Sequence, residues 1–320
     1  TDAYNVAVGF NAGTAVTTGT DNVLIGGLAG DALTDADDNV AVGRSALTND
    51  TLGKKSVAIG RSALQTQNFT TATDTYNTAV GYSAGVAVTT GTGNTFVGGL
   101  AADSLTTGSN NVAIGRDSLG GGSASSAEDN VCVGQAAGFQ ITTGDNNLLL
   151  GHDAGRTGSP GGGLTTQSNE IVFGDENITE AHIQVALTVA SDERDKTDFV
   201  DLDLGLDFVK ALEPVTYYWD KRSKYGDKSA EDYDLNAQTP DGTHKEDWMD
   251  IGFKAQSVQA LEEAAGYKIA DKKNLTVSLS GDGKQYGLRY EKFVPILVKA
   301  IKDQDAIITA LTARIEALES

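Results

Sequence analysis

The segment Ser191–Lys196, which reads Ser-Asp-Glu-Arg-Asp-Lys, holds residue types that could together cut a peptide bond. A serine hydroxyl is a weak nucleophile until a base removes its proton, and a lysine amine can be that base when it is neutral. The Ser-x4-Lys spacing alone does not decide the matter. A serine here is also typical of a helix N-cap, and such a lysine is commonly a solvated charge.

Few other residues suggest chemistry. With one Cys and three His in 320 residues, the chain predicts no intrachain disulfide, no metal cluster and no cofactor. Cys132 lies at an apolar position of a repeat, which predicts a core residue, while His152, His182 and His244 are expected to be structural or solvated. No spaced pair of carboxylates indicates a glycosidase site.

Composition narrows the function classes further. The 24 Lys+Arg against 44 Asp+Glu give a net charge of −20, which argues against nucleic acid or an anionic membrane surface as a partner. A hydrophobic content of 39% is enough for a folded core, and no apolar run approaches the ~18 residues of a membrane span. Because the chain starts at Thr1 without Met or a leader, we expect it to be a fragment.

The composition changes sharply near residue 190. Residues 1–190 hold 30 of the 38 glycines but only 6 of the 24 basic residues, whereas both tryptophans lie in the remainder. This shift predicts two domains, 1–190 and 191–320.

The first domain is a repeat array. The unit Asn-x-x-x-Gly begins at Asn5, Asn22, Asn39, Asn77, Asn94, Asn111, Asn130 and Asn147, with a variant at Ser56 and a weaker last copy that ends at Gly174. Most steps are 17 residues, and the longer ones carry extra residues in 65–76, 120–129 and 156–168. A small residue follows three positions after each Gly, and a Thr-Thr-Gly turn often precedes the next Asn.

This pattern predicts a β-solenoid. Each copy has a β-branched stretch too short for a helix, then a Gly that permits a turn with positive φ. Stacked coils bury an apolar face that one coil cannot bury alone, and Asn at a fixed place could form a hydrogen-bonded ladder along the stack. The aromatic residues that could meet a glycan are Phe10, Phe69, Tyr76, Tyr82 and Phe139, although loops without a ligand explain them as well.

The repeat resembles the β-roll heads of trimeric bacterial adhesins and of some phage fibres. That resemblance implies three chains side by side, and the few large apolar residues in each copy agree with partner chains covering a remaining strip. A monomeric right-handed β-helix is the alternative. The overall fold class is thus predicted as mainly β, a trimeric β-solenoid or β-roll followed by a small α+β domain that ends in a long coiled-coil helix.

The second domain mixes helices and strands. We expect a helix over 204–212 that ends before Pro214, a strand over 215–219 and a strand running into a helix over 251–261. A hairpin is expected from 276–279 and 286–288, followed by a long helix over 290–318.

Four motifs in this order resemble the intramolecular chaperone of phage tailspikes and fibres, the peptidase S74 family. They are Ser191-Asp-x-Arg194-x-Lys196, Leu212-x-Pro214-Val-x-Tyr217-x-Trp219, Ile251-Gly-Phe-x-Ala-Gln256 and Tyr290-Glu-Lys-Phe-x-Pro-x-Leu-x-Lys-Ala-Ile301. The resemblance spans nearly all of residues 191–320.

This resemblance implies self-cleavage by a Ser/Lys dyad. Ser191 would be the nucleophile, Lys196 the general base, and the bond between Ala190 and Ser191 the cleavage point. Asp192 and Arg194 would support the site. Attack by the serine itself and attack by a water activated at the dyad both remain open.

The last helix carries a heptad seam, with Val294, Ile301, Ile308 and Ile315 at a and Leu297, Gln304, Leu311 and Leu318 at d. Such a seam needs a partner helix. Ile at a with Leu at d favours a dimer, whereas the roll and the family resemblance suggest a trimer, which we follow. Packing on its own domain is the alternative.

Together these features predict a phage tail fibre or spike that attaches to a host-surface receptor. The chaperone domain would drive trimer assembly and then release itself. Other virion tail proteins would attach through a missing N-terminal segment, and the shaft would reside in the virion. The alternatives are a bacterial adhesin head, a polysaccharide-degrading tailspike and a membrane-bound transcription factor; the absence of a basic region disfavours the last.

Overall fold

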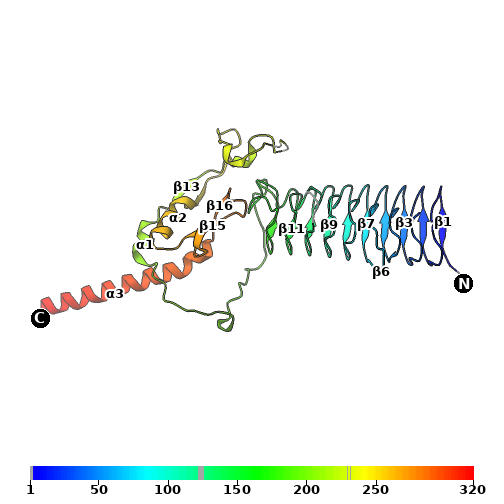
Figure 1. The fold of residues 1–320 in the computed structure, drawn as a ribbon. Coiled ribbons are helices and arrows are strands. Elements are labelled where there is room, and N and C mark those ends of the chain that lie inside the picture. The colour runs from blue at the N-terminus through cyan, green and yellow to red at the C-terminus, as the bar shows by residue number, and fades with distance from the viewer. Residues whose placement is uncertain (1–2, 122–125, 229, 231) are drawn as a thin grey trace. The chain divides into compact units, whose positions relative to one another are not determined.

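A computed structural model of the chain describes residues 3–121, 126–228, 230 and 232–320. It forms two compact units, Thr1–Ile178 with Gly226–Gln238, and Thr179–Tyr225 with Thr239–Ser320. The first is a β-solenoid, and the second is a small mixed domain that ends in a long helix (Figure 1). The division into 1–190 and 191–320, which follows composition and the expected cleavage point, stays a prediction.

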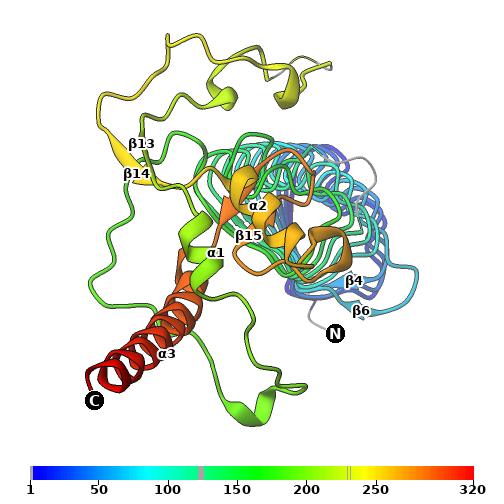
Figure 2. The same ribbon diagram turned by 90° about the vertical axis from the view of Figure 1, so that its left-hand side faces the viewer.

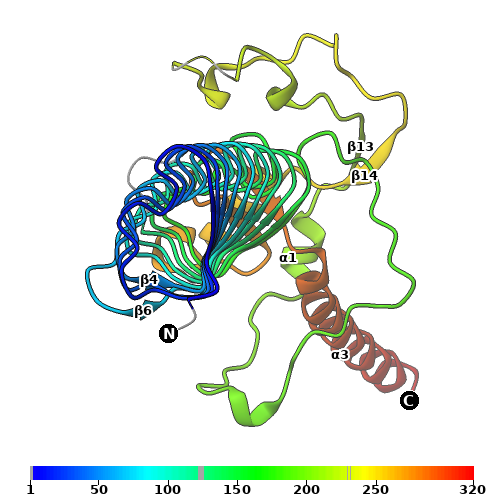
Figure 3. The same ribbon diagram turned by 90° about the vertical axis from the view of Figure 1, so that its right-hand side faces the viewer.

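Ten short parallel strands form one sheet along the solenoid, which confirms the predicted repeat fold. Each strand pairs in register with its counterpart in the next coil, so the coils superimpose when viewed along the stack (Figure 3). The strands are β1 (Val6–Val8), β2 (Val23–Ile25), β3 (Val40–Val42), β5 (Val57–Ile59), β7 (Thr78–Val80), β8 (Thr95–Val97), β9 (Val112–Ile114), β10 (Val131–Val133), β11 (Leu148–Leu150) and β12 (Ile171–Phe173). A second, two-stranded sheet pairs β4 (Gly53–Lys54), which lies before β5, with β6 (Thr73–Asp74), which lies in the longer step before β7.

Side chains alternate along each strand. In every coil from β2 to β12 the middle residue points inward and is buried, while the first and third residues point outward. Ala41, Phe96 and Cys132 are fully buried in this inner column. Burial raises the pKa of the Cys132 thiol to about 12, so this residue is a core filler and not a nucleophile.

The glycine that ends each repeat motif is required by the stacking. Gly60 has φ +129°, and a Cβ atom there would lie 2.3 Å from the carbonyl oxygen of Gly81 in the next coil. No other residue type fits both the backbone conformation and this close approach. The glycine of the Asn-x-x-x-Gly pattern therefore recurs because neighbouring coils lie too close together for a side chain at this position.

The repeated asparagines form the predicted ladder inside the solenoid. The Nδ2 of Asn94 donates to the Gly108 carbonyl at 3.0 Å, which closes its own coil, and to Asn77 Oδ1 at 3.2 Å. The Oδ1 of Asn94 accepts from the backbone N–H of Asn111 at 2.9 Å, which fixes the next coil. Asn94 is fully buried, so water cannot replace these bonds.

Replacing Asn94 by Ala should destabilise the solenoid by about 1–3 kcal/mol, because buried donors and acceptors in two neighbouring coils lose their partner. A lower thermal midpoint and faster unfolding in denaturant would show this. Asn49→Ala, at an exposed position, is the matched control and should change little. Equal effects of the two substitutions would contradict the importance of the ladder.

The second unit contains α1 (Leu206–Ala211), α2 (Ala255–Ala264) and α3 (Phe293–Glu319). Two antiparallel strand pairs accompany them, β13 (Val215–Tyr217) with β14 (Asp250–Gly252) and β15 (Val277–Leu279) with β16 (Tyr286–Leu288). These elements match the order expected from the sequence. Short 3-10 turns lie at Glu193–Asp195, Arg222–Lys224, Leu235–Ala237, Ile269–Asp271 and Tyr290–Lys292; of these, Leu235–Ala237 lies in the segment that clusters with the solenoid.

A small apolar core holds the second unit together. Phe208 of α1, Val258 of α2 and Ile296 of α3 meet in it, with α1 beside the start of α3 (Figure 2). Asp303 of α3 accepts a hydrogen bond from the Leu206 N–H at 3.1 Å and so satisfies the first turn of α1. Buried Glu262 of α2 accepts from the N–H of Thr276 at 2.6 Å, which ties α2 to the β15–β16 hairpin.

The heptad seam of α3 is exposed. The first turns pack inward through Phe293, Ile296 and Ala300, which are not seam residues. Seven of the eight seam positions are exposed large apolar residues, with exposed fractions from 45% at Leu297 to 80% at Leu318. The packing of α3 against the rest of the second unit thus leaves the heptad seam uncovered. Among the described residues, no helix combines the length and the apolar character that a membrane crossing needs.

Candidate active site at the start of the C-terminal unit

A tight turn brings the two ends of the Ser191–Lys196 segment together. Asp192 caps the 3-10 turn Glu193–Asp195 by accepting the Arg194 N–H at 2.9 Å, and the Lys196 N–H donates to the Glu193 carbonyl at 3.1 Å. An aspartate at the cap position satisfies a free N–H of the turn, which explains why this short polar sequence reverses direction. The turn carries the Lys196 side chain back over Ser191.

Ser191 and Lys196, the predicted nucleophile and base, are in direct contact. Lys196 Nζ lies 2.6 Å from Ser191 Oγ and 3.2 Å from the Ser191 carbonyl oxygen. A hydrogen bond of this length is the geometry needed for proton transfer from the hydroxyl to the amine. Both residues are exposed to solvent in the single chain.

Asp192 and Arg194, the predicted supporting residues, pair with each other. Arg194 Nη2 lies 2.6 Å from Asp192 Oδ2, and Arg194 Nε donates to Asp192 Oδ1 at 3.0 Å. The Arg194 side chain, followed by the Arg194 backbone N–H, lowers the pKa of Asp192 below its ordinary value. The Asp192–Arg194 pair therefore stabilises the turn. Because the turn brings Lys196 to Ser191, the pair supports their contact indirectly.

The other three motifs come together in the second unit. In the β13–β14 pair, Val215 lies opposite Gly252, and the Tyr217 hydroxyl donates to Asp250 at 3.3 Å. The Tyr290 hydroxyl accepts from the Phe253 N–H at 3.3 Å, and a Cβ atom on Gly252 would lie 2.3 Å from that hydroxyl. Residues of the three motifs, although far apart in the sequence, thus contact one another around the β13–β14 pair.

Residues 191–267 match the family model of the chaperone of endosialidase, Peptidase_S74. This match confirms the resemblance over residues 191–267 and supports a C-terminal chaperone domain. Members of the family are self-cleaving chaperone domains, and the match begins at Ser191, the predicted nucleophile. The match ends just after α2, before the β15–β16 hairpin and α3 of the second unit. Comparisons with curated proteins and with solved structures gave no match.

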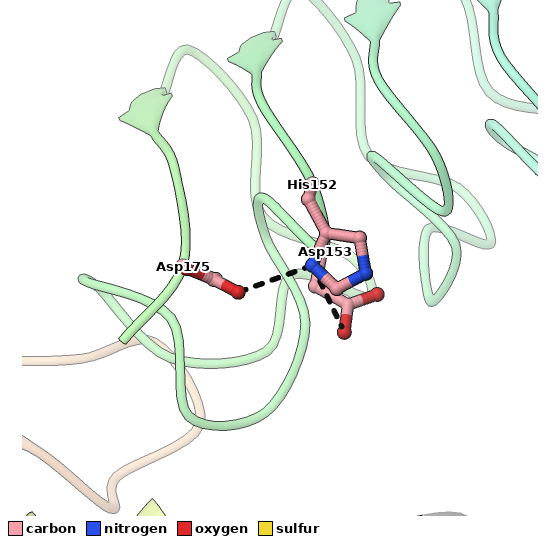
Figure 4. A group of neighbouring side chains, drawn as sticks. All are labelled: His152, Asp153 and Asp175. Carbon is pink, nitrogen blue, oxygen red and sulfur yellow. Dashed lines mark hydrogen bonds and ion pairs between the residues drawn. The ribbon is translucent and has the colours of Figure 1, made fainter. Parts of the chain in front are cut away.

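A second cluster of polar side chains lies at the last coils of the solenoid (Figure 4). His152 Nδ1 lies 3.1 Å from Asp175 Oδ2 and 3.7 Å from Asp153 Oδ2, a set of atoms of the kind that can bind a divalent cation. Both carboxylates are already engaged, because Asp153 accepts from Arg156 at 2.9 Å and Asp175 accepts from the Asn177 N–H at 2.9 Å. Burial opposes ionisation of Asp175, but its hydrogen bonds outweigh burial and lower its pKa. The sequence did not single out this group, whose members come from different coils.

The two other histidines contact neighbouring side chains outside the candidate site. His182 is exposed and lies 2.8 Å from Glu180, and His244 packs edge-on against Tyr225 at 4.8 Å between ring centroids. Phe69, named among the aromatic residues that could meet a glycan, is buried at 7% exposure and is therefore not available to one. Of the insertion 120–129, residues 122–125 lie outside the described part of the chain.

Arg194→Gln should raise the pKa of Asp192 toward its ordinary value, because the side-chain hydrogen bonds that stabilise the carboxylate are lost. In the parent protein, Asp192 therefore stays ionised to lower pH than in the variant. An NMR titration of the side-chain carbonyls would measure the shift. The same titration of Arg116→Gln is the control, and an unchanged Asp192 in Arg194→Gln would contradict the pairing.

Proposed function

We propose that the chain is a bacteriophage tail fibre or spike protein, a homotrimer that attaches to a host-surface receptor. Its chaperone domain drives assembly of the β-solenoid and then releases itself by cutting the bond between Ala190 and Ser191. The 2.6 Å contact between Lys196 and Ser191, at the first residue of the family match, carries this proposal. The repetitive shaft would remain in the virion.

The chemistry follows from the dyad. Ser191 Oγ attacks the carbonyl carbon of Ala190 while Lys196 Nζ takes the hydroxyl proton, and the same proton then passes to the leaving nitrogen of Ser191. An ester links Ala190 to Ser191 Oγ, and water hydrolyses it to a free carboxylate and the original hydroxyl. Attack by a water that Lys196 activates gives the same two products without the ester.

Solvent exposure of the dyad supports control by assembly. A lysine amine in water carries a proton at neutral pH and cannot accept another. Partner chains that cover the Ser191–Lys196 turn would exclude water and favour the neutral amine. Cleavage would then begin only after the chains have come together.

The exposed seam of α3 supports the assembly step. Seven apolar side chains in a and d positions leave a stripe that a parallel partner helix would cover. A coiled coil at residues 290–318 would hold the chains at high effective concentration while the solenoids form. We propose three chains, in line with the family resemblance.

Ser191→Ala should abolish cleavage, because the attacking oxygen is gone. On a denaturing gel the parent should give two fragments, near residues 1–190 and 191–320, whereas the variant stays whole. Lys196→Arg, which keeps the charge but cannot act as the base, should also stay whole. Ser257→Ala, at an exposed serine of α2, is the control and should cleave normally. Mass spectrometry should find Ser191 at the new N-terminus, and uncut parent protein would refute the proposal.

Cleavage should also depend on protein concentration, because assembly precedes chemistry. When denatured parent chains refold at a series of concentrations, the half-time of cleavage should shorten as concentration rises. Ile308→Glu, which places a charge in the α3 seam, should slow cleavage at every concentration. A half-time independent of concentration would show that one chain cuts itself alone.

A further inference from the structure

The solenoid has one apolar face. Among the described residues of the first unit, 13 large apolar side chains are exposed, and 12 of them lie on the ten-stranded sheet or directly beside it. The sheet contributes Val6, Val8, Ile25, Ile59, Val97, Ile114, Ile171 and Phe173, and its borders contribute Tyr4, Phe10, Tyr76 and Tyr82. Single exposed apolar residues are ordinary, but a continuous stripe along the whole stack marks an interaction surface.

We call the outward side chains of the ten strands the sheet face. All of them are aliphatic or aromatic except Thr78 and Thr95. The residue two positions before each strand forms the leading edge, and the residue two positions after each strand forms the trailing edge. The sheet face thus lies between two columns that hold charged, polar, aromatic and glycine residues.

At four of the ten levels, those of β1, β3, β7 and β8, the leading and trailing residues of the same strand match in charge or in type. Beside β3 the leading edge has Asp38 and the trailing edge has Arg44. Both are exposed, and one chain holds them on opposite sides of the strand. An acid on one edge and a base on the other can pair only between two copies.

Aromatic and small residues follow the same rule. The leading and trailing residues are Tyr4 and Phe10 at β1, Tyr76 and Tyr82 at β7, and Gly93 and Gly99 at β8. At β5 both edges are cationic, but Lys55 lies over the Tyr76 ring at 5.2 Å and Arg61 over the Tyr82 ring at 5.6 Å. These cations are therefore held by the aromatic residues of the next coil.

We infer that the sheet face binds other copies of this chain, in parallel and without stagger, so that each leading edge meets a neighbour's trailing edge at the same level. A rotation axis along the stack produces this arrangement for any number of copies. The inference rests on the assembly step of the proposed function. It adds which surface of each chain is in contact, the parallel direction of the chains and the level at which they meet. It does not depend on self-cleavage.

The opposite direction is disfavoured by the same residues. A two-fold axis across the stack would bring leading edge to leading edge with the levels reversed. With full overlap, Asp38 would then meet Asp129, and both are exposed carboxylates. A parallel shift by one coil would instead set Tyr76 against Arg61 or Gly99 and would remove the aromatic and glycine matches.

Cross-linking between engineered cysteines tests the register. In the full chain kept intact by Ser191→Ala, Tyr76→Cys with Tyr82→Cys should be joined between chains by a short bis-maleimide. Tyr76→Cys with Gly99→Cys has the same number of thiols, one level apart, and a Cβ at Gly99 meets no atom within 4 Å. The first pair should give mostly covalent oligomers on a denaturing gel, and the second few. Buried Cys132 should not react.

Two further variants of the first pair test the surface. Ile59→Glu with Ile114→Glu should reduce cross-linking several-fold, whereas Thr107→Glu, exposed and outside the sheet, should not. Asp38→Arg should weaken cross-linking, and adding Arg44→Asp should restore it, because the pair is rebuilt with its charges exchanged. This rescue stays informative even if the glutamate variant fails to fold.

Absence of cross-links in the 76/82 pair, equal cross-linking in the 76/99 pair, or no rescue by the charge exchange would overturn the inference. Because every protein in the test carries Ser191→Ala, failure here leaves the proposed cleavage untouched. Conversely, uncut parent protein would refute the proposed cleavage but would not affect the inference that the sheet face binds other copies.

Discussion

The hydrogen bonds of the buried asparagines are the constraint on which the solenoid depends. Each Asn amide closes its own coil by donating to a carbonyl near the coil's end, as Asn22 does to Ala36 at 2.8 Å. Its oxygen accepts the N–H of the next coil, as Asn22 does from Asn39 at 3.0 Å. A coil without its neighbour leaves buried polar groups unpaired, at a cost of about 1–3 kcal/mol each. Coils are thus stable as neighbours, and the 17-residue spacing is fixed by bonds rather than by apolar packing alone.

The break in this ladder at Ser56, between coils that carry Asn, shows how other side chains can replace the missing hydrogen bonds. Ser56 replaces Asn and is too short to reach the usual partners. Gln67 and Thr75, both from the longer step that follows, take over: Gln67 Nε2 donates to Ser56 Oγ at 2.8 Å, and Thr75 Oγ1 lies 2.6 Å from Ser56 Oγ. Gln67 also accepts from Asn77 at 2.9 Å and donates to buried Asp50 at 2.5 Å. The insertion therefore restores the polar interior and does not form a free loop.

The parts that the sequence predicts well are those that repeat or that depend on local bonding. Asn and Gly at fixed spacing predict the solenoid and its ladder, because each coil repeats one local geometry. The repair at Ser56 and the burial of Phe69 were not predictable, since they depend on how a unique insertion folds over its neighbours. Likewise the resemblance named Ser191 and Lys196, but the turn that joins them depends on the Asp192 cap, whose geometry a spacing of five residues does not specify. The cluster of His152 with Asp175 needs contact between coils 23 residues apart and carries no sequence signal.

The ladder fixes neighbouring coils within one chain, but it does not set the level of one chain against another. The coils resemble one another so closely that an apolar face alone would tolerate a shift by one coil with little loss of burial. Two features can remove this ambiguity: the unequal residues along the two edges of the sheet, and a terminal helix that aligns the chains before the solenoids meet. The second feature is needed only during assembly. In the proposed assembly, many buried contacts would have to break together before the chains could separate, and this high barrier to unfolding would preserve the product without the helix. A chaperone that cuts itself away after alignment is consistent with that physical situation, and a Ser/Lys pair left in water until neighbouring chains cover it would delay the cut until then.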